Sequence, residues 1–147
     1  MNNDKKTQFT QKAATYLCCF NDYCPRHTQC LRWEVGTYVA PATSIVNCVN
    51  PRYQKAIDGQ CDQFRDNQPI TMPVGMKNRF YHDMPAHTAQ AIKAALIAQN
   101  CRATYYKYHR GDLPIVPDYL ALIKRVCLKE GWQQPLQFDS EVTDVVW

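Results

Sequence analysis

Glycine and serine are scarce in this chain of 147 residues, and long apolar runs are absent. The five glycines are isolated, which excludes a phosphate-binding glycine loop, and neither Ser44 nor Ser140 lies in a nucleophile elbow. No stretch approaches the roughly 20 apolar residues that cross a bilayer, so we expect a soluble protein with no membrane partner. These absences leave no reason in the sequence to expect an enzyme.

The N-terminal stretch MNNDKKTQFTQK is polar and charged. It carries neither a secretory signal nor a lipidation motif, so a cytoplasmic location is expected. Thiols stay reduced in that compartment, where cysteines are used for metal binding, redox chemistry or burial rather than for structural disulfides.

Cysteine is abundant, with eight in the chain. Cys19, Cys24 and Cys30 lie in the run CFNDYCPRHTQC, and Cys61 follows in GQCDQF. Four thiolates complete a tetrahedral zinc site or hold an iron–sulfur cluster. We therefore predict a metal site on Cys19, Cys24, Cys30 and Cys61, with Zn²⁺ as the metal and an iron–sulfur cluster as the alternative.

The spacing of these cysteines leaves the ligand set open. Four residues separate Cys19 from Cys24 and five separate Cys24 from Cys30, unlike the CxxC pair that marks a zinc knuckle. Burial of small thiols without any metal is the competing interpretation. The alternative ligands are Cys18, His27 and Cys48. The remaining cysteines, which are expected in the core, are Cys101 and Cys127.

The apolar pattern predicts a mainly α fold. Its helices are expected at 7–18, 28–39, 86–99 and 117–130. Prolines gather between residues 40 and 75 and indicate loops, and the candidate strands are 36–40 and 42–46.

The same pattern divides the chain into two halves. Residues 1–72 form a loop-rich half organised by cysteines and metal, and residues 73–147 form a helical half. The hinge is expected within 69–75, and the two halves are either separate or parts of one compact unit.

The helical half contains an ordered series of helix signals. A helix ends near Asn100, a second covers 102–109 and stops at Gly111, and a third starts at Pro117. This order resembles the repressor-like (Cro-type) helix-turn-helix, whose recognition helix ends in an aromatic–acid–Arg–Gly step. The step here is YHRG, with His109 in place of the acid.

That resemblance implies which side chains are buried and which face DNA. Ala95 takes the small position where two helices cross, and Tyr105 takes the buried position of the second helix. Arginine and lysine reach phosphates or guanine edges, and threonine and tyrosine bond phosphate oxygens. The side chains implied to face double-stranded DNA are Arg102, Thr104, Tyr106, Lys107 and Arg110.

Charge is distributed unevenly, within a net charge of +4. Between residues 77 and 110 the sequence has six Lys or Arg residues but only one acidic residue, Asp83. One surface is therefore expected to meet a polyanion. The competing interpretation treats Tyr105 and Tyr108 as a core stripe and the basic side chains as solvated flanks. A protein partner or a homodimer then takes the place of DNA.

Over nearly its full length the chain resembles an uncharacterised bacterial family of unknown function. The features that carry this resemblance are the run CFNDYCPRHTQCLR, the step from Cys61 to Phe64, the segment YYKYHRG and the terminal Trp147. We predict a nucleic-acid-binding regulatory or accessory protein with a structural Cys-ligated metal. The alternatives are a metal- or redox-sensing protein-interaction module without nucleic acid, and an iron–sulfur protein.

Overall fold

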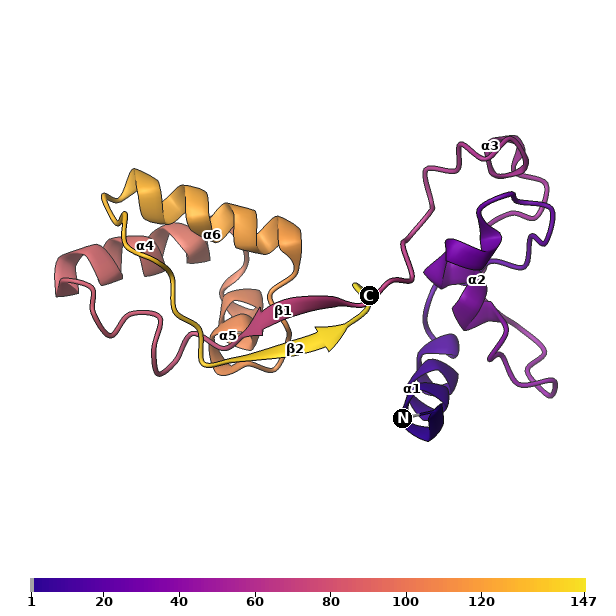
Figure 1. Cartoon of the computed structure of the whole chain (residues 1–147), viewed down its shortest axis with the longest axis horizontal. Coiled ribbons are helices and arrows are strands. Elements are labelled where there is room, and N and C mark those ends of the chain that lie inside the picture. The colour runs from indigo at the N-terminus through magenta and orange to yellow at the C-terminus, as the bar shows by residue number, and fades with distance from the viewer. Residues whose placement is uncertain (1) are drawn as a thin grey trace. The chain divides into compact units, whose positions relative to one another are not determined.

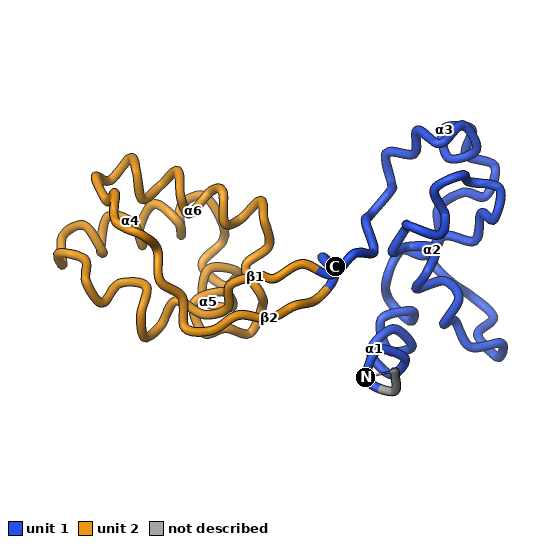
Figure 2. The backbone as a smooth tube through the Cα atoms, viewed as in Figure 1, with its two compact units in different colours: residues 1–69, 145–147 blue, residues 70–144 orange. Residues whose placement is uncertain are grey.

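The computed structural model describes the chain from residue 2 to residue 147, with side chains from Asp4 onward. The chain divides into two units (Figure 2). Unit 1 comprises residues 1–69 and 145–147, and unit 2 comprises Ile70–Asp144. The division falls three residues before the predicted one, and the last three residues belong to the first unit rather than to the second.

Among its described residues, unit 1 contains three α-helices, which are labelled in Figure 1, and one 3₁₀ turn. These elements are α1 (Asn2–Ala13), η1 (His27–Gln29), α2 (Leu31–Gly36) and α3 (Gln54–Ile57). The rest of the unit is turns and extended segments, as the prolines of 40–75 indicate.

A small apolar core holds unit 1 together. Trp147 lies edge-on to Phe9, with ring centroids 5.2 Å apart, and Lys12 Nζ lies 5.0 Å from the Trp147 ring centroid. The C-terminal tryptophan therefore docks on α1. The buried members of this core are Phe9, Ala13, Cys18, Leu31, Val35 and Val145.

Hydrogen bonds between distant segments replace long helices in the rest of unit 1. Leu31 N–H donates to the Arg65 carbonyl at 2.7 Å. The Arg32 side chain, only 8% exposed, donates to the carbonyls of Gln63 and Leu17 at 2.7 and 3.1 Å. Arg32 thus ties α2 to the segments on both sides of it.

Unit 2 packs three helices with a two-stranded antiparallel sheet. The helices are α4 (Ala86–Gln99), α5 (Arg102–Arg110) and α6 (Pro117–Lys129), and the strands are β1 (Ile70–Val74) and β2 (Ser140–Asp144). Met72 pairs with Val142 at the centre of the sheet.

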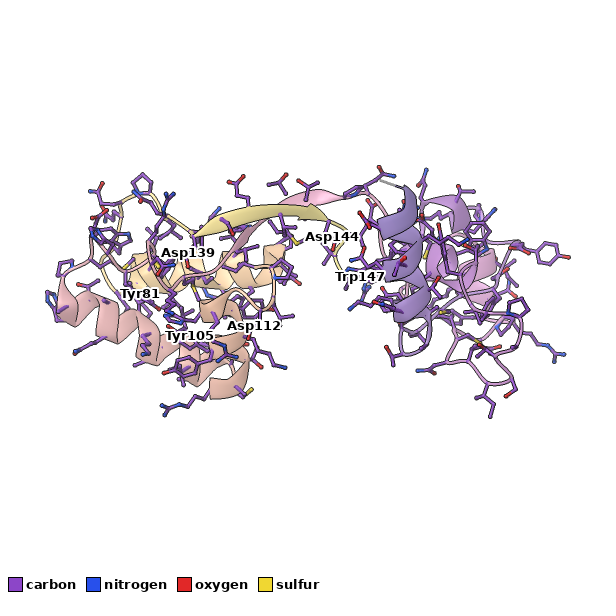
Figure 3. The ribbon with its side chains drawn as sticks, turned by 90° about the horizontal axis from the view of Figure 1, so that it is seen from below. Tyr81, Tyr105, Asp112, Asp139, Asp144 and Trp147 are labelled. Atoms are coloured by element: carbon purple, nitrogen blue, oxygen red, sulfur yellow. The ribbon has the colours of Figure 1, made fainter. Side chains whose placement is uncertain are left out.

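Local signals explain where these helices begin and end. Gly111 follows α5 with φ +83°, the left-handed conformation that closes a helix, and Pro117 occupies the first turn of α6. Tyr105 is completely buried, and its hydroxyl lies 3.0 Å from the Tyr81 hydroxyl (Figure 3). Tyr108 stacks on Tyr119 at 4.1 Å between ring centroids.

The Asp139 side chain holds the loop that follows β1 through hydrogen bonds. Its carboxylate accepts backbone N–H groups from Lys77, Asn78 and Arg79 at 2.9, 2.9 and 3.0 Å (Figure 3). Gly75 has φ +78°, and a Cβ there would lie 2.7 Å from the Asp139 carboxylate. The glycine is therefore required for this close approach.

Replacing Asp139 is expected to destabilise unit 2. Asp139→Ala removes three hydrogen bonds to one charged group, which we expect to lower the free energy of unfolding by about 2–4 kcal/mol. Urea-dependent amide exchange in α4, α5 and α6 measures the change. The exposed Glu141→Ala removes the same charge from β2 and should change stability by less than about 0.5 kcal/mol. Equal effects of the two variants would contradict this account of Asp139.

The helix predictions for unit 2 agree with the structure. The predicted helices 86–99, 102–109 and 117–130 correspond to α4, α5 and α6 within one residue at each end. The helix predicted at 7–18 starts earlier and ends at Ala13, and the one predicted at 28–39 is split into η1 and α2.

The predicted strands are wrong. Gly36 ends α2, and residues 37–40 and 42–46 form turns and irregular backbone, while the actual strands lie at Ile70–Val74 and Ser140–Asp144. Both strands of a two-stranded ribbon are edges, which is why β1 accommodates Pro73. Within residues 2–147, no helix is both long enough and apolar enough to span a bilayer.

Candidate functional site

Four cysteines from separate segments line one small cavity in unit 1. Cys19 follows α1, Cys24 and Cys30 stand on either side of η1, and Cys61 comes from the loop after α3. The cavity measures about 20 Å³, close to the space that one water molecule or one small ion needs. The four cysteines predicted as metal ligands thus surround a single space.

The sulfur atoms do not form a coordination sphere as they stand. Among the residues that the structure describes, no three His, Cys, Asp or Glu side chains are arranged to hold a metal ion. All eight cysteines are free thiols. The backbone therefore brings the four cysteines to one cavity, but their side chains are not arranged to hold a metal ion.

Asn21 contributes a buried amide to the wall of this cavity. Its side chain is 4% exposed, and its Oδ1 accepts the Tyr23 N–H at 3.0 Å. Its Nδ2 is buried and has no hydrogen-bond partner among the described residues. Leaving such a donor unsatisfied costs about 1–3 kcal/mol, and a thiolate sulfur in the cavity is a suitable acceptor.

The Cys19 thiol is close to the other three cysteines of the cavity. Burial raises the pKa of the Cys19 thiol, the Asn21 backbone N–H lowers it, and Cys30, Cys61 and Cys24 raise it again. Thiolates crowded in this way repel one another unless a cation lies between them. The donor set therefore suits a thiophilic divalent ion and disfavours free thiolates.

His27 is oriented as metal-binding histidines commonly are. Its Nδ1 lies 2.7 Å from the Cys24 carbonyl oxygen, which can only accept, so Nδ1 carries the proton. The other ring nitrogen, Nε2, then has a free lone pair in the neutral ring. The ring lies edge-on to Trp33 at 4.6 Å, and His27 lines the cavity, so it remains an alternative ligand.

The other cysteines lie elsewhere. Cys18 and Cys48 do not line the cavity and pair with each other across an isolated bridge. Cys127 is buried in the core of unit 2, where burial raises its pKa to about 11. The expected core position of Cys101 is wrong, because this residue is an exposed N-cap of α5 whose sulfur accepts the Thr104 N–H at 3.4 Å.

The residues implied to face DNA lie on α5, but their surroundings differ. Arg102 and Lys107 are exposed, and neither makes an ion pair within the described part of the chain. Arg110 is exposed but pairs with Asp112 at 2.6 Å, and the Thr104 hydroxyl lies 3.0 Å from the Cys101 sulfur. Arg102 and Lys107 are therefore the two cations of α5 that have no ion pair among the described residues.

Tyr106 lies at the centre of a cationic cluster that includes a residue missing from the sequence prediction. Lys93 Nζ on α4 and the Arg102 guanidinium lie 5.5 and 5.6 Å from the Tyr106 ring centroid. Hydrogen bonding and charge from Lys93, with a smaller contribution from Arg102, lower the pKa of the Tyr106 hydroxyl. The basic stretch 77–110 contains Lys93, but only the packing of α4 on α5 brings it to this cluster.

Comparison with known proteins identifies a family but no activity. No curated protein and no solved structure is recognisably similar to this chain. The chain belongs to DUF6078, a family of unknown function whose model matches residues 1–147. The match agrees with the full-length resemblance to a family of unknown function.

Proposed function

For this member of a family of unknown function, we propose a metal-stabilised nucleic-acid-binding protein of regulatory or accessory type. Unit 1 holds Zn²⁺ through Cys19, Cys24, Cys30 and Cys61, and unit 2 binds double-stranded DNA. The observation that carries the proposal is the lining of one cavity by all four of these cysteines. When bound, the ion joins the segments that carry these four cysteines.

The metal is proposed as structural because four protein ligands leave no open coordination position. Unit 1 has a small core and short helices, so it buries little apolar surface of its own. Metal binding then supplies much of the folding free energy of the segment around the cavity. An iron–sulfur cluster is the second candidate for the same thiols, and it would give a brown protein after anaerobic purification.

Removing the Asn21 amide tests whether thiolates occupy the cavity. Asn21→Ala is expected to weaken zinc affinity about 10- to 100-fold, because a donor to the ligand sulfurs is lost. Competition with a zinc-binding dye measures this affinity. Asn50 is the matched control, since its Oδ1 likewise accepts the N–H two residues on, at 3.0 Å, but it is exposed and outside the cavity lining.

The two asparagine variants distinguish the loss of a turn hydrogen bond from the loss of a hydrogen-bond donor to the cavity. Asn50→Ala removes only a turn hydrogen bond and should leave zinc affinity unchanged. Equal affinities for Asn21→Ala and the unchanged protein would show that the Asn21 amide faces no ligand sulfur.

The proposed nucleic-acid surface is the exposed side of α5 with Lys93 of α4. Three features support it: a two-residue connection between α4 and α5, the burial of Tyr105, and unpaired cations at Arg102 and Lys107. The burial of Tyr105 is what the helix-turn-helix resemblance implies, and the unpaired cations supply charge for phosphate contacts. Salt-dependent binding to duplex DNA tests this proposal.

Two apolar side chains favour a second candidate function. Tyr23 and Ile45 in unit 1 are 89% and 87% exposed. Such side chains suit a metal- or redox-sensing module that docks on a protein partner or on a second copy of the chain. Absence of any duplex binding at low salt favours this candidate over the nucleic-acid function.

A further inference from the structure

A second pair of cysteines in unit 1 lies apart from the four that line the cavity. An isolated parallel bridge places Cys18 opposite Cys48. Cys18 N–H donates to the Asn47 carbonyl at 2.9 Å, and Val49 N–H donates to the Cys18 carbonyl at 2.9 Å. Neighbouring strands lie about 4.8 Å apart. This spacing falls within the Cα separations of about 4.4–6.8 Å that disulfides span.

Both side chains of this pair are turned away from the cavity. The next residues along the chain, Cys19 and Val49, line the cavity, and successive side chains of an extended segment point to opposite faces. Cys18 has 0% exposure and belongs to the core of unit 1, whereas Cys48 is half-buried. An oxidant therefore reaches Cys48 first.

A hydrogen bond holds the Cys18 thiol in place. The Cys18 S–H donates to the Tyr16 carbonyl with the heavy atoms 3.5 Å apart. Cys18 is thus a buried thiol beside a more accessible one, so that Cys48 meets the oxidant first and Cys18 is the neighbouring thiol that can resolve it.

We propose that Cys18 and Cys48 form a reversible disulfide with hydrogen peroxide as the oxidant, at a redox site separate from the proposed metal centre. The Cys48 sulfur attacks a peroxide oxygen, so that an S–O bond forms, the O–O bond breaks and one water leaves. The Cys18 sulfur then attacks the Cys48 sulfenic acid, so that the S–S bond forms, the S–O bond breaks and a second water leaves. The two thiols lose two electrons in total, and the peroxide accepts them. This site needs no metal and goes beyond the function proposed above.

Peroxide treatment of the folded, full-length protein tests the proposal. After limited hydrogen peroxide and alkylation, non-reducing tryptic digestion is expected to yield a cross-link between the peptides 13–26 and 33–52, with fragment ions placing it on Cys18 and Cys48. Dithiothreitol should restore both thiols. The Cys48→Ser variant should lose the cross-link completely and leave Cys18 reduced, because Cys18 is buried.

The exposed Cys101→Ser is the matched control and should retain the full yield of cross-link. Two outcomes would overturn the proposal. In one, Cys48 is oxidised to sulfinic acid while Cys18 remains a free thiol. In the other, the cross-link joins Cys19 to Cys48.

Discussion

Chelation of the metal is expected to unfold the cavity region of unit 1 and to leave unit 2 folded. Structural zinc contributes an apparent free energy of about 10–16 kcal/mol in zinc-finger peptides, which is as large as the whole stability of a typical domain, about 5–15 kcal/mol. Unit 2 has its own core, which includes Tyr105, Ile92 and Ile123. The two units should therefore respond differently to the same chelator.

Amide hydrogen exchange, measured segment by segment, distinguishes the two responses. Residues 18–65 should lose essentially all protection on chelation, whereas α4, α5 and α6 should keep theirs. The variant Cys61→Ser should reproduce the loss without chelator, and the exposed Cys101→Ser should leave exchange unchanged. Unchanged protection of 18–65 in the metal-free protein would contradict a structural role for the ion.

Replacing the two unpaired cations of α5 is expected to weaken binding to duplex DNA and to flatten its salt dependence. Each lost phosphate contact reduces the slope of log K against log salt by about 0.9, so Arg102→Gln with Lys107→Gln should reduce it by about 2. Fluorescence anisotropy of a labelled duplex at several salt concentrations gives the slope. The reduction should be similar for unrelated duplex sequences, because phosphate contacts do not read bases.

A matched control separates local contacts from total charge. Lys124 and Arg125 are exposed on α6, and replacing both with glutamine removes the same charge from the same unit. That variant should keep the original slope. If the two double variants give the same slope, the α5 surface is ruled out as the contact. If no complex forms at low salt, DNA is ruled out as a ligand.

The helices of unit 2 could be predicted because their signals are local. Gly111 and Pro117 mark an end and a beginning within the chain segment itself, and α4 is rich in alanine. The strands could not be predicted in the same way, because Met72 pairs with a residue 70 positions further along the chain. Strand pairing across such a distance leaves no pattern in either segment alone.

The same distinction between local signals and tertiary contacts applies to the candidate site. Thiol chemistry selects Cys19, Cys24, Cys30 and Cys61 from the sequence, and the structure adds that these four line one cavity. That they bind metal stays a prediction. The packing of Lys93 on Tyr106 and the buried amide of Asn21 depend on tertiary contacts, so no local pattern indicates them. Cys101 was misplaced because its apolar context resembles a core position, although it caps a helix at the surface.

Elemental analysis of the freshly purified protein tests the central claim most directly. The account predicts one zinc ion per chain in the unchanged protein, and loss of that zinc from Cys61→Ser but not from Cys101→Ser. A protein that is folded throughout, contains neither zinc nor iron and titrates as eight free thiols would contradict it.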